Sequence, residues 1–229
     1  QGPAASWHRW ATPAARRGCA ALVQFAPAAG PGYEDVPLDD ERTPATSTSY
    51  VRRDLMMAIQ HATATVACVA RTWPGGLGAP LALGDGSDRA GATPGTAQAR
   101  PRHPPSTHVD GRDLDLAYYQ LDQPDNHLRA ICDHVVAGVD QRHCVGPPRH
   151  LDAARTALLI GVLLESPRVR TIGVDAAAAP ALEAALRDHC RAGRVGAAAC
   201  PPTRLSYEPV DRGRGWFYAH HNHLHVAWR

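Results

Sequence analysis

The sequence lacks the features that mark several large classes of proteins. Its longest strongly apolar run, Ala157–Leu164, has eight residues, far fewer than the roughly 20 that cross a bilayer, so we expect no membrane span. The formal net charge at pH 7 is only +2 and gives no reason to expect a nucleic-acid binder, which gathers basic residues on one face. Lysine is absent, and all 24 basic residues are arginine. With the abundant Ala, Pro and Gly, this indicates a GC-rich coding sequence rather than a chemical role.

No Cys-x-x-Cys pair occurs either, which argues against a zinc ribbon and against a thioredoxin-like redox motif. The six cysteines are scattered along the chain, at Cys19, Cys68, Cys132, Cys144, Cys190 and Cys200. Their even number favours up to three disulfides in an oxidising compartment, with buried free thiols as the alternative. The one pairing that we predict is Cys190–Cys200, because the loop between them is short and contains two glycines. The sequence begins at Gln1 rather than Met, so we expect that a segment such as a signal peptide precedes it.

The apolar residues present, with hydrophobic residues at 44%, suffice for the core of one domain of ordinary size. Residues 1–45 are predicted to form an irregular N-terminal arm, and residues 46–229 the folded domain. The spacing of apolar residues predicts helices over Tyr50–Arg71, Asn126–Ala137, Asp152–Leu164 and Pro180–Ala192. It predicts strands over Ala79–Leu83, Leu114–Leu121, Val169–Val174, Arg204–Tyr207 and Trp216–Trp228. This mixture indicates an α+β fold, with a small, mostly antiparallel sheet flanked by helices.

Side chains that can bind a metal are concentrated in two short segments. The first reads Ser-Thr-His-Val-Asp-Gly-Arg-Asp-Leu-Asp over residues 106–115, and the second reads His-His-Asn-His-Leu-His over residues 220–225. Four of the 13 histidines fall in the second segment. These histidines alternate with Leu224 and Val226 and lead into Trp228, a pattern that indicates a strand rather than a surface tail or a purification tag.

The alternation within both segments predicts that their polar side chains converge. Because residues two apart in a strand point to the same face, His223 and His225 project together. Asp113 and Asp115 share a face in the same way, and the glycine before them can fold His108 back toward them. Imidazole nitrogens and a carboxylate are a usual ligand set for zinc, and three protein ligands leave the fourth position open to water. The sequence therefore predicts a zinc site built from the two segments, on the sheet.

The pattern Ser-x-His-x-x-Gly-x-Asp-x-Asp followed by a late His-x-His resembles a known group of zinc metallopeptidases. The group contains the penicillin-insensitive murein endopeptidases, the D-Ala-D-Ala peptidases, the lysostaphin-type peptidases and the hedgehog domains. Six residues separate His108 from Asp115, as in that group. His220, His223 and His225 stand where the murein endopeptidase motif has its three late histidines.

This resemblance implies a Zn²⁺ cofactor with His108, Asp115 and His225 as its ligands. It implies that His223 is the general base or its functional partner, and that His220 is a second catalytic histidine that stabilises the transition state. Relatives that end in Glu-x-x-His use a glutamate base, but an asparagine stands three residues before the last ligand here. The murein endopeptidase branch is therefore favoured.

Two neighbouring positions are open to more than one interpretation. Asp113 is expected either to orient a ligand of the metal or to be a solvated carboxylate at the strand surface. Murein endopeptidases commonly carry Gly-Gly-Arg and a His-x-x-His before the first ligand, whereas residues 100–105 here read Arg-Pro-Arg-His-Pro-Pro. We therefore expect a different substrate-facing loop. His103 belongs either to the site or only to that loop, and we favour the loop. The resemblance covers about residues 50–229, with specific agreement only in the two motifs.

The reaction that the resemblance implies is amide hydrolysis by a metal-activated water, with His223 transferring the proton to the leaving amine. The implied substrate is peptidoglycan, at the D-Ala to diaminopimelate cross-link, and the implied location is the periplasm or the exterior. A D-Ala carboxypeptidase or a secreted lytic peptidase of the same group is an alternative. An alternative of another class is a non-catalytic zinc-containing binding module. The presence of His220 and His223 beside the ligand set argues against this alternative.

Overall fold

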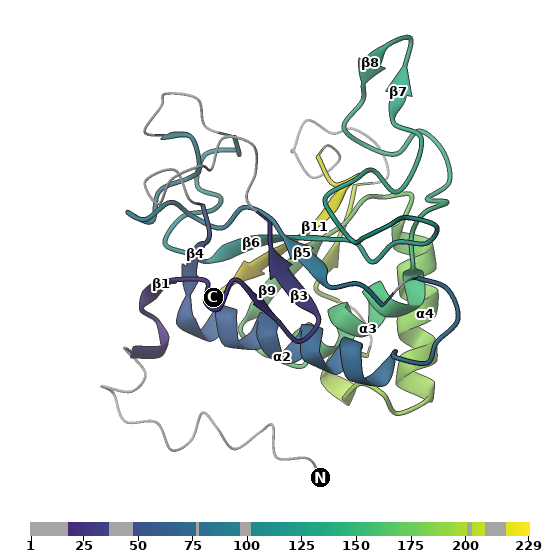
Figure 1. Cartoon of the computed structure of the whole chain (residues 1–229), viewed down its shortest axis with the longest axis horizontal. Helices are drawn as coiled ribbons and strands as arrows, with labels where there is room; N and C mark the ends of the chain where they lie inside the picture. Colours follow the sequence, from purple (N-terminus) through teal and green to yellow (C-terminus); the bar gives the residue numbers. More distant parts are fainter. Residues whose placement is uncertain (1–17, 37–47, 77, 97–101, 201–202, 209–218) are drawn as a thin grey trace.

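The computed structural model describes residues 18–36, 48–76, 78–96, 102–200, 203–208 and 219–229. Within these residues the chain forms an α+β fold, as predicted, with three α-helices against a seven-stranded mixed sheet (Figure 1). The helices are α2 (Arg53–Val69), α3 (Ala153–Leu164) and α4 (Ala179–Arg191). A short 3₁₀ turn, η3, covers Ala197–Ala199.

The seven-stranded sheet has the order β10-β9-β11-β6-β5-β3-β2. Its strands are β2 (Ala29–Gly30), β3 (Tyr33–Asp35), β5 (Leu81–Leu83), β6 (Asp113–Ala117), β9 (Val169–Gly173), β10 (Leu205–Ser206) and β11 (His223–Trp228). Pairs β10–β9 and β5–β3 are parallel, and the other four neighbouring pairs are antiparallel. Two further ribbons pair β1 (Leu22–Gln24) with β4 (Tyr50–Arg52), and β7 (Val135–Val136) with β8 (Val139–Asp140).

Helix α3 lies at the centre of the core. Every residue from Arg155 to Leu164 is buried, because the helix packs between α2, α4 and β9. Asp152 caps the first turn of this helix, because its Oδ1 accepts a hydrogen bond of 3.0 Å from the backbone N–H of Arg155. Aspartate is a favoured N-cap residue, and the helix was predicted to start at Asp152. In Figure 1 the helices lie on one side of the sheet, and the β7–β8 ribbon projects on the other side. The helix-free side therefore carries the loops that surround the candidate site.

The predicted helices that correspond to α2, α3 and α4 are confirmed, as are the strands that correspond to β5, β6, β9 and β10, within a few residues at each end. The last predicted strand starts later than expected, because β11 begins at His223. Residues 216–218 of that prediction lie outside the described residues. The periodicity of apolar side chains was sufficient to predict a helix or strand wherever one face of that element is buried in the common core.

The helix predicted over Asn126–Ala137 is wrong. A disulfide joins Cys132 to Cys144, and the segment between them turns back on itself as the β7–β8 ribbon through Gly138, at φ +80°. The preceding residues make long-range rather than helical hydrogen bonds, as when the Asn126 side chain donates to the carbonyl of Ala79 at 2.7 Å. Spacing of apolar residues cannot distinguish such a loop from a helix, because the competing contacts come from distant segments.

Part of the predicted N-terminal arm belongs to the sheet. Strand β3 pairs in parallel with β5, and its Tyr33 is buried with its ring centroid 5.3 Å from that of Phe25. The description of residues 22–35 as irregular is therefore corrected, since strands of two or three residues are too short to produce a readable alternation. Residues 1–17 and 37–45 of the arm lie outside the described residues, and the domain boundary at residue 46 stays a prediction.

Two disulfides are present among the described residues. Cys190–Cys200 confirms the predicted pairing, and Cys132–Cys144 is the second. Cys19 and Cys68 are free and exposed, so the third disulfide that the even count allowed is not formed. Across the described ranges, each helix is too short or too polar to serve as a membrane span.

Candidate metal centre

The centre is built on β6 and β11, which are neighbours in the middle of the sheet. The two strands pair antiparallel with His225 opposite Asp115 and His223 opposite Ala117. Between the two histidines, Leu224 is fully buried in the hydrophobic core. Because a shift of one residue would turn every side chain of β11 to the other face, burial of the leucine fixes both histidines on the face away from the core. The alternation in the sequence predicts this arrangement.

A tight turn before β6 brings His108 onto the same face. Three of its residues have positive φ, with His108 and Asp110 at +55° and Gly111 at +62°. A Cβ atom at Gly111 would lie 2.6 Å from the backbone nitrogen of Arg52, so this position requires glycine. The backbone N–H of His108 donates to Asp113 Oδ2 at 3.1 Å, which closes the turn. As predicted, the glycine turn folds His108 back toward the aspartates.

Asp115 lies at the centre of the histidines. Its Oδ1 is 3.5 Å from His108 Nε2 and 2.9 Å from His225 Nδ1. Its Oδ2 is 3.7 Å from His223 Nε2 and 3.9 Å from His103 Nε2. Burial alone would raise the pKa of this carboxyl, but the imidazoles of His108, His223 and His225 together lower it well below its usual value. The group is therefore a carboxylate.

His108 presents a nitrogen lone pair toward this carboxylate. Its side chain is fully buried, and burial lowers its pKa to about 4, so the ring is neutral. Nδ1 lies 3.0 Å from the carbonyl oxygen of Gly86 and must carry the proton, because a carbonyl only accepts. Nε2 is then an acceptor, and it has no hydrogen-bond partner among the described residues. A buried acceptor next to a carboxylate fits a cation between them, since buried polar atoms are nearly always satisfied.

His225 is held by a carboxylate at each ring nitrogen. Nδ1 donates to Asp115 Oδ1 and Nε2 to Asp113 Oδ1, both at 2.9 Å. Burial lowers the pKa of His225, but these two carboxylates outweigh it and raise the pKa to about 9. Metal-binding histidines commonly donate their second ring N–H to a carboxylate, which fixes the ring. Asp113 occupies that position relative to His225, and its side chain is buried rather than solvated at the strand surface.

His103 belongs to the centre, contrary to the expectation that it lies on a loop outside it. Its ring stacks on that of His108 with centroids 3.8 Å apart, and its Nε2 donates to Asp85 Oδ2 at 2.6 Å. Arg102 also contacts Asp85, at 2.7 Å, so one buried carboxylate draws this part of the loop inward. His103, His108 and Asp115 can each place a ligand atom within 4.8 Å of the other two.

His223 and His220 line the pocket above the centre. The pocket has a volume of about 370 Å³, and its lining residues come from the loop before β6, from the β8 end of the ribbon and from the segment entering β11. Burial lowers the pKa of His223, so its ring is neutral at neutral pH. The rings of His220 and His223 have centroids 5.3 Å apart. The structure thus gathers all six residues that the sequence singles out: His108, Asp113, Asp115, His220, His223 and His225.

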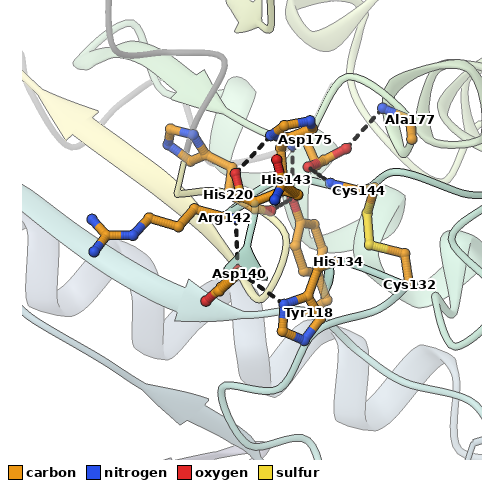
Figure 2. Close-up of a disulfide and its surroundings, with 11 residues drawn as sticks. Tyr118, Cys132, His134, Asp140, Arg142, His143, Cys144, Asp175, Ala177 and His220 are labelled. Carbon is orange, nitrogen blue, oxygen red and sulfur yellow. Dashed lines mark hydrogen bonds and ion pairs between the residues drawn. A yellow bond between two sulfur atoms is a disulfide. The ribbon is translucent and has the colours of Figure 1, made fainter. Parts of the chain in front are cut away.

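Tyr118 supports His220 from below and was not anticipated from the sequence. Figure 2 shows its hydroxyl between two backbone groups: it donates to the carbonyl of His220 and accepts from the N–H of Asp175, each at 3.0 Å. Burial raises the pKa of this phenol far above its usual value, so it stays protonated. The sequence signal was weak, because a tyrosine within the predicted strand Leu114–Leu121 is most simply interpreted as a core residue.

These buried imidazoles and carboxylates can hold a metal ion, and their geometry leaves the identity of the metal open. No known protein family matches the sequence. No curated protein is similar enough to count as a match.

Proposed function

We propose that this chain is a zinc-dependent peptidase that hydrolyses the peptide cross-links of peptidoglycan. The proposed ligands are His108, Asp115 and His225. The observation that carries the proposal is the buried carboxylate of Asp115 between two imidazoles, one of which has an unpartnered acceptor nitrogen. A pocket opens directly onto this group, as a reaction on a bound substrate requires.

The ligand set supports zinc over calcium or magnesium. Two imidazoles and one carboxylate are usual for zinc, whereas calcium and magnesium prefer oxygen ligands. His103 can serve as a further ligand or can contact the substrate, since its ring stacks against His108. The two disulfides suit a periplasmic or secreted location, which is also where the proposed substrate occurs.

When bound, zinc acts as a Lewis acid toward the scissile carbonyl and lowers the pKa of water toward about 7. His223 is the proposed general base. Its Nδ1 lies 2.7 Å from the side-chain oxygen of Asn222, so Nδ1 carries the proton and donates it to that oxygen. Nε2, on the side of Asp115, is therefore free to accept a proton and to pass it to the leaving amine.

His220 has a different proposed role. It lines the same pocket, and in its protonated form it can offset negative charge on the oxygen of the tetrahedral intermediate. Its backbone is fixed by the hydrogen bond from Tyr118. A fixed donor serves this purpose better than a mobile one, because a preorganised donor need not reorient during the reaction.

The substrate and the bond cleaved rest on the resemblance described above, and digestion of purified sacculi tests them. Separation of the muropeptides should show loss of cross-linked dimers and a gain of monomers whose stem peptides keep their length. Monomers shortened by one D-Ala would indicate the carboxypeptidase instead. Intact dimers and unshortened monomers, with one zinc ion bound per chain, would contradict hydrolysis and favour the binding module. His61→Ala, an exposed histidine on α2, is the matched control.

A further inference from the structure

A second group of metal-capable side chains lies in the loop closed by the Cys132–Cys144 disulfide. His134, Asp140 and His221 can each place one ligand atom within 4.8 Å of the other two. His134 Nδ1 is 3.0 Å from Asp140 Oδ1, a contact drawn in Figure 2. The ring centroids of His134 and His221 are 4.6 Å apart. None of these residues is part of the centre on β6 and β11.

The backbone holds the three residues together without any ion. His134 and Asp140 flank the β7–β8 ribbon, and the N–H of Gln141 donates to the carbonyl of His134 at 2.8 Å. The disulfide closes the base of this ribbon. The segment that carries His221 is tied to the same loop on both sides. The N–H of Ile131 donates to the carbonyl of His221 at 2.9 Å, and the N–H of residue 219 donates to that of residue 142.

One of the three side chains has an unsatisfied ring nitrogen. His221 is only 8% exposed, and its Nδ1 is buried with no hydrogen-bond partner among the described residues. Polar atoms of this kind are rarely left unsatisfied, and a missing ion is one of the standard explanations. The orphaned nitrogen belongs to a ring that packs beside His134. It is therefore an observation independent of the His134–Asp140 contact.

We propose that His134, Asp140 and His221 form a second site for a divalent first-row transition metal such as Zn²⁺. Two imidazoles and a carboxylate are ligands that these metals accept. Ligand atoms about 2.0–2.1 Å from a tetrahedral zinc ion lie about 3.3 Å from one another. The 3.0 Å between His134 and Asp140 is close to that spacing. Distances up to 4.8 Å to the remaining ligand atom require only a small closure.

The second site shares the pocket with the first. Asp140 and His221 both line it, and His221 directly follows His220 in the sequence. An ion at this position places positive charge on the wall of the same pocket, which the exposed Arg142 also lines. The site is also open to solvent, because the side chains of His134 and Asp140 are 29% and 51% exposed. We expect it to exchange its ion faster and to bind more weakly than the buried centre.

The test is a calorimetric titration of the full chain with Zn²⁺ after chelation, without a histidine tag and without reductant, so that both disulfides stay intact. The wild type should bind two equivalents of different affinity. Asp140→Asn should keep the tight equivalent and weaken the other at least tenfold, because it keeps the shape of the side chain but removes the charge. His134→Ala should do the same. Asp133→Asn, in the same loop but outside the group, should bind like the wild type.

Two results would overturn the proposal. One is a wild type that binds a single equivalent whose affinity neither Asp140→Asn nor His134→Ala changes. The other is a pair of variants, Asp140→Asn and His134→Ala, that both bind two equivalents with unchanged affinities. Far-ultraviolet circular dichroism of each variant identifies any that fail to fold, and the two substitutions alter different residues. Because the readout is metal stoichiometry rather than hydrolysis, a failure here leaves the proposed peptidase function intact, and the reverse also holds.

Discussion

The two histidine–aspartate groups differ in what holds their members in place. The group on β6 and β11 is buried, and its proposed ligands His108, Asp115 and His225 are at most 6% exposed. Sheet register positions Asp115 and His225, and the turn before β6 positions His108. The group of His134, Asp140 and His221 is half open to solvent and is positioned by a ribbon and a disulfide. In the first arrangement further carboxylates fix the orientation of the rings, whereas the second depends on a covalent closure of its loop.

This contrast shows that the types of residue alone do not determine what a group of imidazoles and carboxylates can do. Both groups combine imidazoles with a carboxylate, but only the buried one has neutral His223 next to it and a carboxylate at the far nitrogen of a ligand histidine. Preorganised groups of this kind are needed for tight binding and for proton transfer. We therefore propose hydrolysis only for the buried centre, and metal binding alone for the second group. Four sets of substitutions test this distinction.

Asp115→Asn should have the largest effect. It removes the central carboxylate charge while keeping the size of the side chain, so the tight metal equivalent and peptidoglycan hydrolysis should both be lost. The weaker equivalent should persist, since Asp115 is not part of the second group. Zinc titration with muropeptide analysis measures both effects. Loss of the weaker equivalent as well, in a folded protein, would show that the two groups are not independent.

His223→Ala should separate metal binding from catalysis within the buried centre. Loss of a general base typically lowers a rate by about 10²–10⁴-fold, whereas the three proposed ligands stay in place. We expect the zinc content of the wild type and hydrolysis reduced by that factor. Full activity in this variant would remove His223 from the mechanism, and parallel loss of zinc would instead make it a ligand. His61→Ala controls for the loss of a histidine as such.

Asp113→Asn should have an intermediate effect. The substitution weakens the hydrogen bond that orients His225, and such changes typically lower metal affinity by about 10–100-fold. Competition with a chromophoric chelator measures the affinity. The weaker equivalent should keep its affinity, and the secondary structure should be unchanged. An unaltered tight affinity would mean that Asp113 serves only to close the turn through the N–H of His108.

Removal of the Cys132–Cys144 disulfide should have the smallest effect on the buried centre and a selective effect on the second group. The double substitution Cys132→Ser with Cys144→Ser frees the loop, and the ligands of the second group are then no longer preorganised. We therefore expect the affinity of this group for zinc to fall on the order of tenfold. The matched control is Cys190→Ser with Cys200→Ser, which lies outside both groups and should leave both affinities unchanged. Equal effects of the two double variants would mean that the loop disulfide does not organise the second group.

The sequence predicted the centre on β6 and β11 well because its geometry is local. Alternation along one strand brings His223 and His225 together, and the turn at Gly111 lies within three residues of His108. The fold was predictable for the same reason where a whole face is buried, as in α2, with its regularly spaced Leu55, Ile59 and Val66. Burial of one face of a strand or helix produces a regular spacing of apolar residues that can be recognised in the sequence.

What could not be predicted depends on contacts between distant segments. His103 enters the centre because Asp85 draws the loop inward, and no spacing in the Pro-rich stretch reveals that contact. The second group unites His134 with His221, which are far apart in the sequence and share no strand. The wrong helix over residues 126–137 has the same cause, since a disulfide and long-range hydrogen bonds outweigh a local apolar pattern.

The central claim is that the buried centre holds zinc, and the zinc content of the purified wild-type chain tests it most directly. Elemental analysis after prolonged dialysis against metal-free buffer should find one zinc ion per chain, with the second equivalent removed by the dialysis. A dialysed protein that is folded, free of metal and still cleaves peptidoglycan cross-links would contradict the account.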